Sequence, residues 1–312
     1  MRRRDLWLIL VAMAGIALGV GLPAVGLLIR PTVLYLMMTI LFMSFLKIDL
    51  AGLARFGPGD AAAVVLWSGL KLIALPVVLW ALARWLLPGY ALAVLLLTAT
   101  STGVTAPFFA VLLGANTVRV LQLVVVTSLL VPLTLPALVR LLMGAEVAIG
   151  FMPMARMLLL IIVVPFALSL ATRRWLPALA RAIDRVQYPL SLTLFFLINW
   201  GVFAAYRGLL VGHGWDLAVA VGVAGVLAGV YCAAGCLAGA LAGRGEDALT
   251  GGVMMTYINN VLVIVFASQF FGQHQPEAPL LAAMYLVPFF FVVIPLRWVA
   301  GRRGRKTAPP PG

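Results

Sequence analysis

Ten apolar stretches, each long enough to cross a lipid bilayer as a helix, follow one another along the chain. About 20 apolar residues in a helix span the hydrocarbon core of a bilayer. Because that core offers no water to the backbone, each stretch is predicted to be α-helical. A composition of 64% hydrophobic and 10% charged residues agrees, since a soluble surface needs more polar side chains. The predicted spans cover residues 6–29, 31–47, 61–86, 90–113, 117–143, 152–171, 187–211, 215–242, 247–271 and 277–298.

The distribution of basic residues predicts how these spans are oriented. Of the 22 Lys and Arg residues, sixteen lie on the side of the N-terminus, five lie on the opposite side, and Lys71 lies within a span. Cytoplasmic loops are enriched in Lys and Arg, so both termini are predicted to be cytoplasmic, in a bacterial-type inner membrane. Topology thereby explains the net charge of +13, and nucleic acid is not an expected partner.

The order of the spans predicts two inverted halves. Residues 1–150 hold five spans and residues 151–300 hold five more, and an odd number places the second half upside down relative to the first. A basic cytoplasmic link over residues 171–187 is expected between the sixth and seventh spans. Residues 301–312, basic at first and then rich in proline, are expected to form a disordered cytoplasmic tail.

Two of the spans contain residues that disfavour a continuous helix. In 90–113, hydroxyl residues crowd around Gly103 and Pro107, and a proline removes one backbone donor. In 247–271, two adjacent asparagines are costly at membrane depth unless they face protein, water or a ligand. Interruptions at corresponding places of two halves indicate a transporter's binding site, although small and hydroxyl residues also serve helix packing. The candidate site residues in these segments are Thr100, Ser101, Thr102, Thr105, Thr256, Tyr257, Asn259 and Asn260.

Lys71 lies deep within the third predicted span. It is about ten residues into 61–86, which at about 1.5 Å per residue is near the middle of the bilayer. No Asp or Glu lies deep inside any predicted span, and an unpaired Lys there costs at least a few kcal/mol, ~3 on insertion scales. Snorkelling from mid-membrane is difficult, so Lys71 is expected to lose its proton or to meet backbone carbonyls or an anionic ligand.

Together these segments resemble the bile acid:sodium symporter family, part of a superfamily of bile acid, arsenite and riboflavin transporters. The resemblance rests on residue patterns that occur in the same order, at 31–50, 70–79, 96–116, 127–132 and 257–271. It implies a panel domain made of the first, second, sixth and seventh spans, and a core domain made of the other six. It further implies that the broken fourth and ninth spans cross near mid-membrane and that substrate binds between the two domains.

The residues at the family's sodium sites differ in this chain. The family pattern Glu-x-Gly-x-Gln-Asn in the ninth helix is matched by Met-Thr-Tyr-Ile-Asn-Asn at 255–260, so Met255 stands in place of the acidic ligand. The family's Gln five residues before the proline of the third helix is replaced by Lys71. Because a hard cation prefers several oxygens and a carboxylate, the Lys71 ammonium is hypothesised to occupy the place of a sodium ion. The hydroxyls retained in the fifth helix, further candidate site residues, are Thr127 and Ser128.

The function predicted from these features is alternating-access secondary transport of a small organic anion or amphipathic carboxylate. It is expected to be independent of sodium, with Lys71 as counter-charge or proton carrier, and sodium-coupled symport of the bile-acid type is the alternative. Asn199, within the seventh span, is expected either to contact substrate from the panel or to serve as a packing amide. The expected partners are the organic anion, the lipid bilayer and protons.

Other classes of function are weaker predictions. An intramembrane enzyme needs acids, bases or metal ligands, yet His213 and His274 lie in short loops without a carboxylate pair. A channel would expose a more regular polar stripe along several spans. No Gly-x-x-x-x-Gly-Lys-Ser/Thr motif for ATP occurs, and no cofactor or metal is expected. Arsenite export is set aside because the family's cysteine in the fourth helix is absent.

Overall fold

The fold of this chain is helical throughout the part that the structure describes. This structure is a computed structural model and describes residues 3–46, 58–144, 147, 149–212, 214–242 and 247–307, in which no strand occurs. The elements are α1 (Arg3–Gly21), α2 (Pro23–Ile29), η1 (Arg30–Thr32), α3 (Val33–Phe45), α5 (Pro58–Gly69), η2 (Leu70–Ala74), α6 (Leu75–Leu86), η3 (Pro88–Tyr90), α7 (Ala91–Thr98), α8 (Ala106–Leu113), α9 (Thr117–Met143), α10 (Phe151–Trp175), α11 (Pro177–Ala205), α12 (Arg207–Gly212), α13 (Gly214–Ala242), α14 (Ala248–Thr256), α15 (Asn260–Phe270), α16 (Glu277–Met284), α17 (Leu286–Phe291) and α18 (Val293–Thr307).

Several helical stretches have the length and apolarity needed to cross a membrane. Two shorter apolar stretches, Pro88–Thr98 and Asn260–Phe270, lie between them in the chain. The prediction of an all-helical, multi-pass membrane protein is therefore confirmed. Among the described residues, the seven long stretches are Pro23–Phe45, Gly59–Leu86, Thr117–Met143, Phe151–Trp175, Pro177–Ala205, Gly214–Ala242 and Glu277–Gly301.

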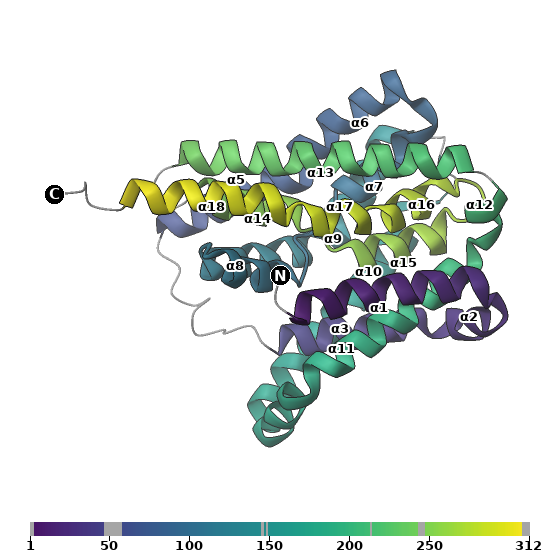
Figure 1. Cartoon of the computed structure of the whole chain (residues 1–312), viewed down its shortest axis with the longest axis horizontal. Coiled ribbons are helices and arrows are strands. Elements are labelled where there is room, and N and C mark those ends of the chain that lie inside the picture. The colour runs from purple at the N-terminus through teal and green to yellow at the C-terminus, as the bar shows by residue number, and fades with distance from the viewer. Residues whose placement is uncertain are drawn as a thin grey trace.

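The helices pack as two groups (Figure 1). In one group α1, α2, α3 and α10 pack around α11. In the other, α13 packs against α14 and α16, α7 packs against α6 and α16, and α9 contacts α5, α8 and α14. The two groups meet where α10 packs along α9 and where α3 contacts α15. Most helices run in roughly the same direction, as expected for segments that cross one bilayer (Figure 1).

The first turn of the chain lies earlier than the sequence suggested. The first span was expected to continue to residue 29, but α1 ends at Gly21, and residues 23–45 form one helical stretch through η1. Leu22 adopts a non-helical conformation, with φ −125° and ψ 63°. The residue before a proline is disfavoured in the α conformation. Leu22 before Pro23 follows this preference, whereas Arg30 before Pro31 stays helical, with φ −47° and ψ −44°.

The expected link between the sixth and seventh spans is helical. α10 continues to Trp175 and α11 begins at Pro177, so the residues of the expected link, 171–187, belong to these two helices and the chain turns at Leu176. Pro177 suits the first turn of a helix, where its missing N–H costs nothing. Gln187 lies within α11, is buried, and donates from Nε2 to the Met43 carbonyl of α3 at 3.0 Å.

The expectation of a disordered tail from residue 301 is wrong for its first part. α18 continues to Thr307, and residues 308–312 lie outside the described residues. Arg and Lys are good helix formers, and no proline occurs between Pro295 and Pro309 to stop the helix.

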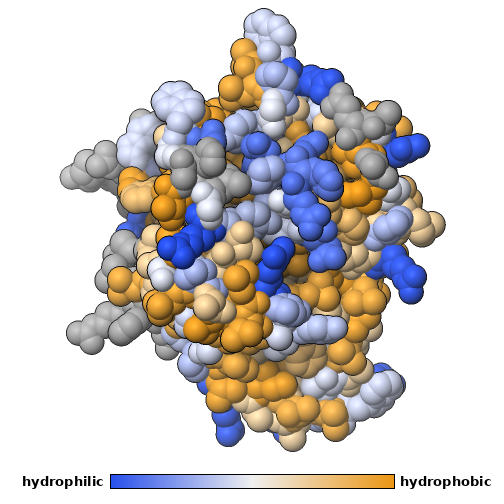
Figure 2. Space-filling model, turned by 90° about the vertical axis from the view of Figure 1, so that its right-hand side faces the viewer, coloured by the Kyte–Doolittle hydropathy of each residue, from blue (hydrophilic) through white to orange (hydrophobic). Residues whose placement is uncertain are grey.

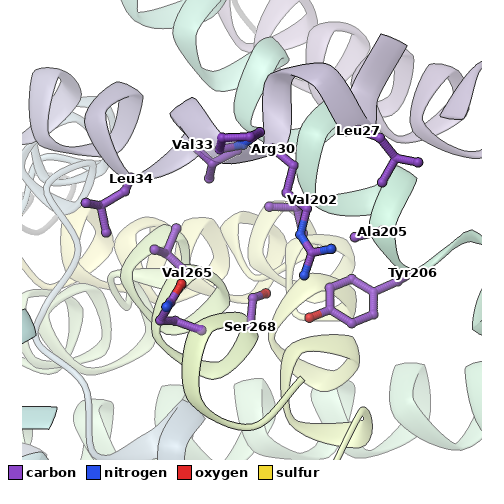
Figure 3. A pocket seen from close by; sticks show the side chains of 11 residues that line it. Leu27, Arg30, Val33, Leu34, Val202, Ala205, Tyr206, Val265 and Ser268 are labelled. Carbon is purple, nitrogen blue, oxygen red and sulfur yellow. The ribbon is translucent and has the colours of Figure 1, made fainter. Parts of the chain in front are cut away.

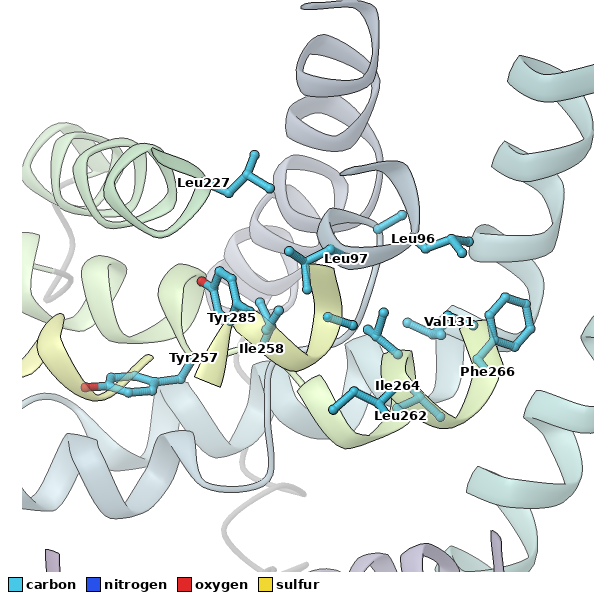
Figure 4. Packing of buried hydrophobic residues seen from close by; sticks show 14 of the residues in the cluster. Leu96, Leu97, Val131, Leu227, Tyr257, Ile258, Leu262, Ile264, Phe266 and Tyr285 are labelled. Atoms are coloured by element: carbon cyan, nitrogen blue, oxygen red, sulfur yellow. The ribbon is translucent and has the colours of Figure 1, made fainter. Parts of the chain in front are cut away.

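The interior of the larger helix group is a continuous apolar cluster. Figure 4 shows Leu96 and Leu97 of α7, Val131 of α9, and Leu262 and Ile264 of α15 packed together. Each of these side chains is almost completely buried. This cluster fixes α7, α9 and α15 relative to one another, and these are the elements that border the interrupted segments.

Glycines let α13 and α14 approach closely. A Cβ at Gly235 of α13 would lie 2.8 Å from the carbonyl carbon of Gly251 in α14, and a Cβ at Gly251 would lie 3.0 Å from that of Gly235. Small residues at such contacts allow helix backbones to pack directly in membranes. In contrast, a Cβ at Gly225, earlier on α13, meets nothing within 4 Å.

Replacing Gly235 by alanine is expected to destabilise the protein by ~2 kcal/mol, because the added methyl group must push α13 away from α14. Gly225→Ala on the same helix is expected to be neutral or stabilising, by up to ~1 kcal/mol, because alanine favours a helix and the site is open. Thermal unfolding of the two purified variants measures both effects. Equal melting temperatures for both variants would contradict the close α13–α14 contact.

Candidate functional site

Two helical segments are interrupted, and their interruptions meet. α7 ends at Thr98 and α8 begins at Ala106, while α14 ends at Thr256 and α15 begins at Asn260. Between them the backbones pair in antiparallel fashion: Gly103 N–H donates to the Tyr257 carbonyl at 2.7 Å, and Asn259 N–H donates to the Ser101 carbonyl at 2.9 Å. Non-helical backbone at membrane depth needs such internal partners. We call the segments 99–105 and 257–259, together with this pairing, the crossing.

The last carbonyls of α14 are each bound by a side chain from another element. Thr102 Oγ1 donates to the Met254 carbonyl at 3.0 Å. Lys71 Nζ donates to the Met255 carbonyl. The Tyr285 hydroxyl, between α16 and α17, donates to the Thr256 carbonyl at 2.9 Å. These carbonyls have no partner within the helix itself, so the three side chains satisfy them at the point where α14 ends.

Lys71 is completely buried, on a π-helical turn. The turn, η2, lies between α5 and α6 just before Pro76, whose missing N–H prevents regular α-helical bonding there. The Lys71 Nζ lies 4.8 Å from the centroid of the Tyr231 ring of α13, a cation–π arrangement. Among the described residues no Asp or Glu forms an ion pair with Lys71. Of the alternatives expected for Lys71, the structure shows contact with a backbone carbonyl.

Thr127 of α9 also supports the crossing. Its Oγ1 accepts from the Thr102 N–H at 3.1 Å and donates to the Leu123 carbonyl of its own helix at 2.6 Å. Ser128 is buried beside it, and its hydroxyl has no hydrogen-bond partner within the described residues. The two hydroxyls predicted from α9 thus differ: one positions the backbone and the other is unsatisfied.

Several polar groups at the crossing are buried without partners. Buried polar atoms in proteins are almost always hydrogen-bonded, and those that are not mark functional sites or bound water. The Tyr257 ring stacks on Phe109 at 3.9 Å between centroids and meets Phe289 edge-on, so its hydroxyl is held in place by aromatic packing. Within the described residues, the unpartnered atoms here are Thr100 Oγ1, Ser101 Oγ, Ser128 Oγ, the Tyr257 hydroxyl, Asn259 Nδ2 and both amide atoms of Asn260.

Two of the predicted residues donate to carbonyls of their own helices, and a third precedes a helix without capping it. The Asn199 amide donates to the Phe195 carbonyl of its own helix at 2.7 Å, and its Cβ lies close to Gly15 of α1, so the packing alternative fits it. Thr105 precedes α8 and makes no side-chain cap to it. Thr256 Oγ1 donates to the Gly252 carbonyl one turn earlier, at 2.7 Å.

The sequence reasoning missed two tyrosines of this site. The Tyr231 hydroxyl donates to the Thr98 carbonyl, the last of α7, at 2.9 Å, and Tyr285 binds the end of α14 as described above. Both are fully buried. The available signal was a single tyrosine within an otherwise apolar stretch, because a buried tyrosine hydroxyl usually finds a partner.

The polar groups at this site are of few chemical kinds. Within the described residues no group of three or more His, Cys, Asp or Glu residues is placed to hold a metal ion. The groups that do gather are hydroxyls, amides, carbonyls and the amine of Lys71. Such groups suit reversible binding of a polar or anionic ligand. No family model and no curated protein sequence matches this chain.

Proposed function

We propose that the protein is a secondary active transporter of a small organic anion or amphipathic carboxylate, working without sodium. The observation that carries this proposal is the crossing itself, beside which a buried Lys71 donates to the Met255 carbonyl. Interrupted helices that meet near the middle of the membrane provide the binding sites of many secondary transporters. The unpartnered Thr100, Ser101 and Asn260 groups supply polar contacts there.

Lys71 supports the sodium-independent form of this proposal. The C-terminal end of a helix carries a partial negative charge, and in transporters the ends of half-helices hold the coupling cation. Lys71 Nζ binds the end of α14, so a protonated Lys71 acts as a tethered cation at the place where a free cation would bind. If Lys71 loses and regains its proton during the cycle, transport is coupled to protons instead.

The topology that goes with this proposal is ten spans in two inverted halves, with both termini cytoplasmic. α7 with α8, and α14 with α15, are then the broken fourth and ninth spans. The group of α1–α3, α10 and α11 corresponds to the panel, and the remaining helices correspond to the core. Movement of one group against the other would expose the crossing to each side of the membrane in turn. Membership of the bile acid:sodium symporter family, as a divergent member, belongs to the same proposal.

A sodium-coupled symporter is the second candidate. Buried hydroxyl oxygens without partners, on Thr100, Ser101 and Ser128, are the ligand type that a sodium ion prefers. Lys71 opposes this reading because an ammonium close to the site repels a second cation.

Sodium is expected to have no effect on either stability or transport. A ligand that binds the folded state raises the melting temperature by mass action. The melting temperature of the purified protein is therefore expected to be the same in sodium chloride and in choline chloride of equal ionic strength. In proteoliposomes, uptake of a radiolabelled organic acid is expected to saturate with substrate, to be accelerated by the same acid on the opposite side, and to proceed equally with either cation.

Each alternative predicts a different result in these assays. A saturable acceleration by sodium would establish the symporter reading and overturn the tethered-cation role of Lys71. Flux that neither saturates nor responds to substrate on the opposite side would indicate a channel. Protein-free liposomes and heat-denatured protein are the controls for leakage.

A further inference from the structure

A pocket opens between the two helix groups, at the end of the molecule where α2 and α12 lie. One wall comes from α2, η1 and the start of α3, a second from the end of α11, and a third from α15 (Figure 3). Its volume is about 460 Å³, which is within the range of small-molecule sites. Figure 2, which looks at this end of the molecule, shows hydrophilic side chains gathered in the middle of the face with hydrophobic ones around them.

Four polar side chains line this pocket: Arg30, Tyr206, Ser268 and Gln269. Arg30 extends into the pocket between Ser268 and Tyr206, and the Tyr206 hydroxyl points toward Ser268 (Figure 3). Tyr206 is only 8% exposed, and its hydroxyl interacts with that of Ser268, although within the described residues neither hydroxyl makes a hydrogen bond of good geometry. Arg30 forms no ion pair with any described residue. One cation and a pair of hydroxyls that are not fully hydrogen-bonded are thus left to contact a ligand.

The Tyr206 phenol is a donor at neutral pH. Apart from Arg30, Tyr206, Ser268 and Gln269, the lining of the pocket is apolar, formed by Leu27, Pro31, Val33, Leu34, Val202, Ala205 and Val265. A ligand that fits both the polar and the apolar side of the pocket has an anionic oxygen group at one end and a short hydrocarbon body at the other.

We propose that this pocket binds a small amphipathic carboxylate, with Arg30 as its counter-charge and Tyr206 and Ser268 as hydrogen-bond donors. The inference rests on the proposed function in one respect: the pocket is then a binding site on the path of the transported anion, separate from Lys71 and the crossing. Because it lies between the two helix groups, movement of one group against the other opens or closes it. A pocket of this volume favours a single small anion over a phospholipid with two acyl chains.

Binding of 4-phenylbutyrate to the purified full-length protein in neutral detergent tests this inference. Melting temperature is measured against ligand concentration for the wild type, Arg30→Gln, Tyr206→Phe and the control Arg207→Gln, with neutral 4-phenylbutyramide as the uncharged analogue. Arg207 is an exposed arginine of α12, next to the pocket in sequence but absent from its lining. We expect 4-phenylbutyrate, but not the amide, to stabilise the wild type and Arg207→Gln.

Arg30→Gln is expected to weaken this binding about tenfold or more, because a hydrogen bond to a charged group contributes ~1.5–3 kcal/mol. Tyr206→Phe is expected to weaken it by a few fold, ~5 times, through loss of one donor. Equal binding by the wild type and Arg30→Gln, or no binding of 4-phenylbutyrate by the wild type, would overturn the inference. Stabilisation by phosphatidylglycerol but not by 4-phenylbutyrate, dependent on Arg30, would assign the pocket to a lipid and overturn it as well.

Uptake assays separate this inference from the proposed function. If Arg30→Gln loses 4-phenylbutyrate binding but no organic acid is carried into proteoliposomes by the wild type, the pocket is established and the transporter proposal fails. If uptake of an organic acid is saturable and Arg30→Gln binds 4-phenylbutyrate as the wild type does, the transporter proposal stands and the pocket inference fails.

Discussion

Replacing Gly103 by alanine is expected to destabilise the protein by more than ~3 kcal/mol or to prevent its folding. A Cβ at Gly103 would lie 2.8 Å from the carbonyl carbon of Ile258, in backbone that cannot move without breaking the pairing of the crossing. The Gly103 N–H would lose its bond to the Tyr257 carbonyl, and both groups would be buried without partners. Large effects of this kind arise from overpacking combined with unsatisfied polar groups.

The measurement is the yield of monodisperse protein and its melting temperature in detergent. Gly222→Ala is the matched control, because a Cβ at Gly222 of α13 meets nothing within 4 Å. It is expected to fold like the wild type. A Gly103→Ala variant with the wild-type melting temperature would mean that the two interruptions do not hold each other in the paired arrangement.

Replacing Lys71 by methionine is expected to abolish transport, with a loss of about 100-fold or more in uptake, while the protein still folds. Methionine fills most of the same volume, so the packing against Tyr231 is largely retained, but the charge and the donor to the Met255 carbonyl are lost. Losing that donor costs ~1–3 kcal/mol of stability. Without the cation, an anionic substrate at the crossing has no counter-charge.

Lys71→Gln separates the charge of Lys71 from its hydrogen bond. Glutamine keeps an N–H donor that can reach the Met255 carbonyl but carries no charge. We expect Lys71→Gln to be closer to the wild type in melting temperature than Lys71→Met and to be equally inactive in uptake. Full activity of Lys71→Gln would assign Lys71 a structural role only, as the cap of α14, and would remove the argument for an anionic substrate.

The site was predictable where the sequence departs from what a membrane helix tolerates. Two otherwise apolar stretches contain residues that disfavour a membrane helix: the hydroxyl residues around Gly103, and the adjacent asparagines at 259 and 260. The chain leaves the helical conformation at both places. Lys71 stood out for the same reason, since a charge in the bilayer core needs a partner. These local sequence features did not predict which residue each polar group would contact.

Helix boundaries were less predictable where two nearby prolines could each set the turn. The apolar run that starts at residue 6 continues through Pro23 to Ile29 and ends at Arg30, so the sequence favours Pro31 over Pro23 as the turn. The structure places the turn at Leu22 because α2 then packs against the end of α11, where Gly26 lies close to Trp200 and Ala204. A contact between residues so far apart in the chain leaves no local pattern.

The sequence by itself determined that the chain is a bundle of apolar helices and where two of them break, because length, apolarity and helix-breaking residues act locally. α9, expected over 117–143, begins at Thr117 and ends at Met143. Only the tertiary structure decided that Gly103 pairs with Tyr257, that Tyr231 and Tyr285 bind helix ends, and that Arg30, Tyr206 and Ser268 share a pocket. These partners are brought together by the packing of whole helices, which depends on the shapes of many side chains at once rather than on any residue's neighbours in sequence.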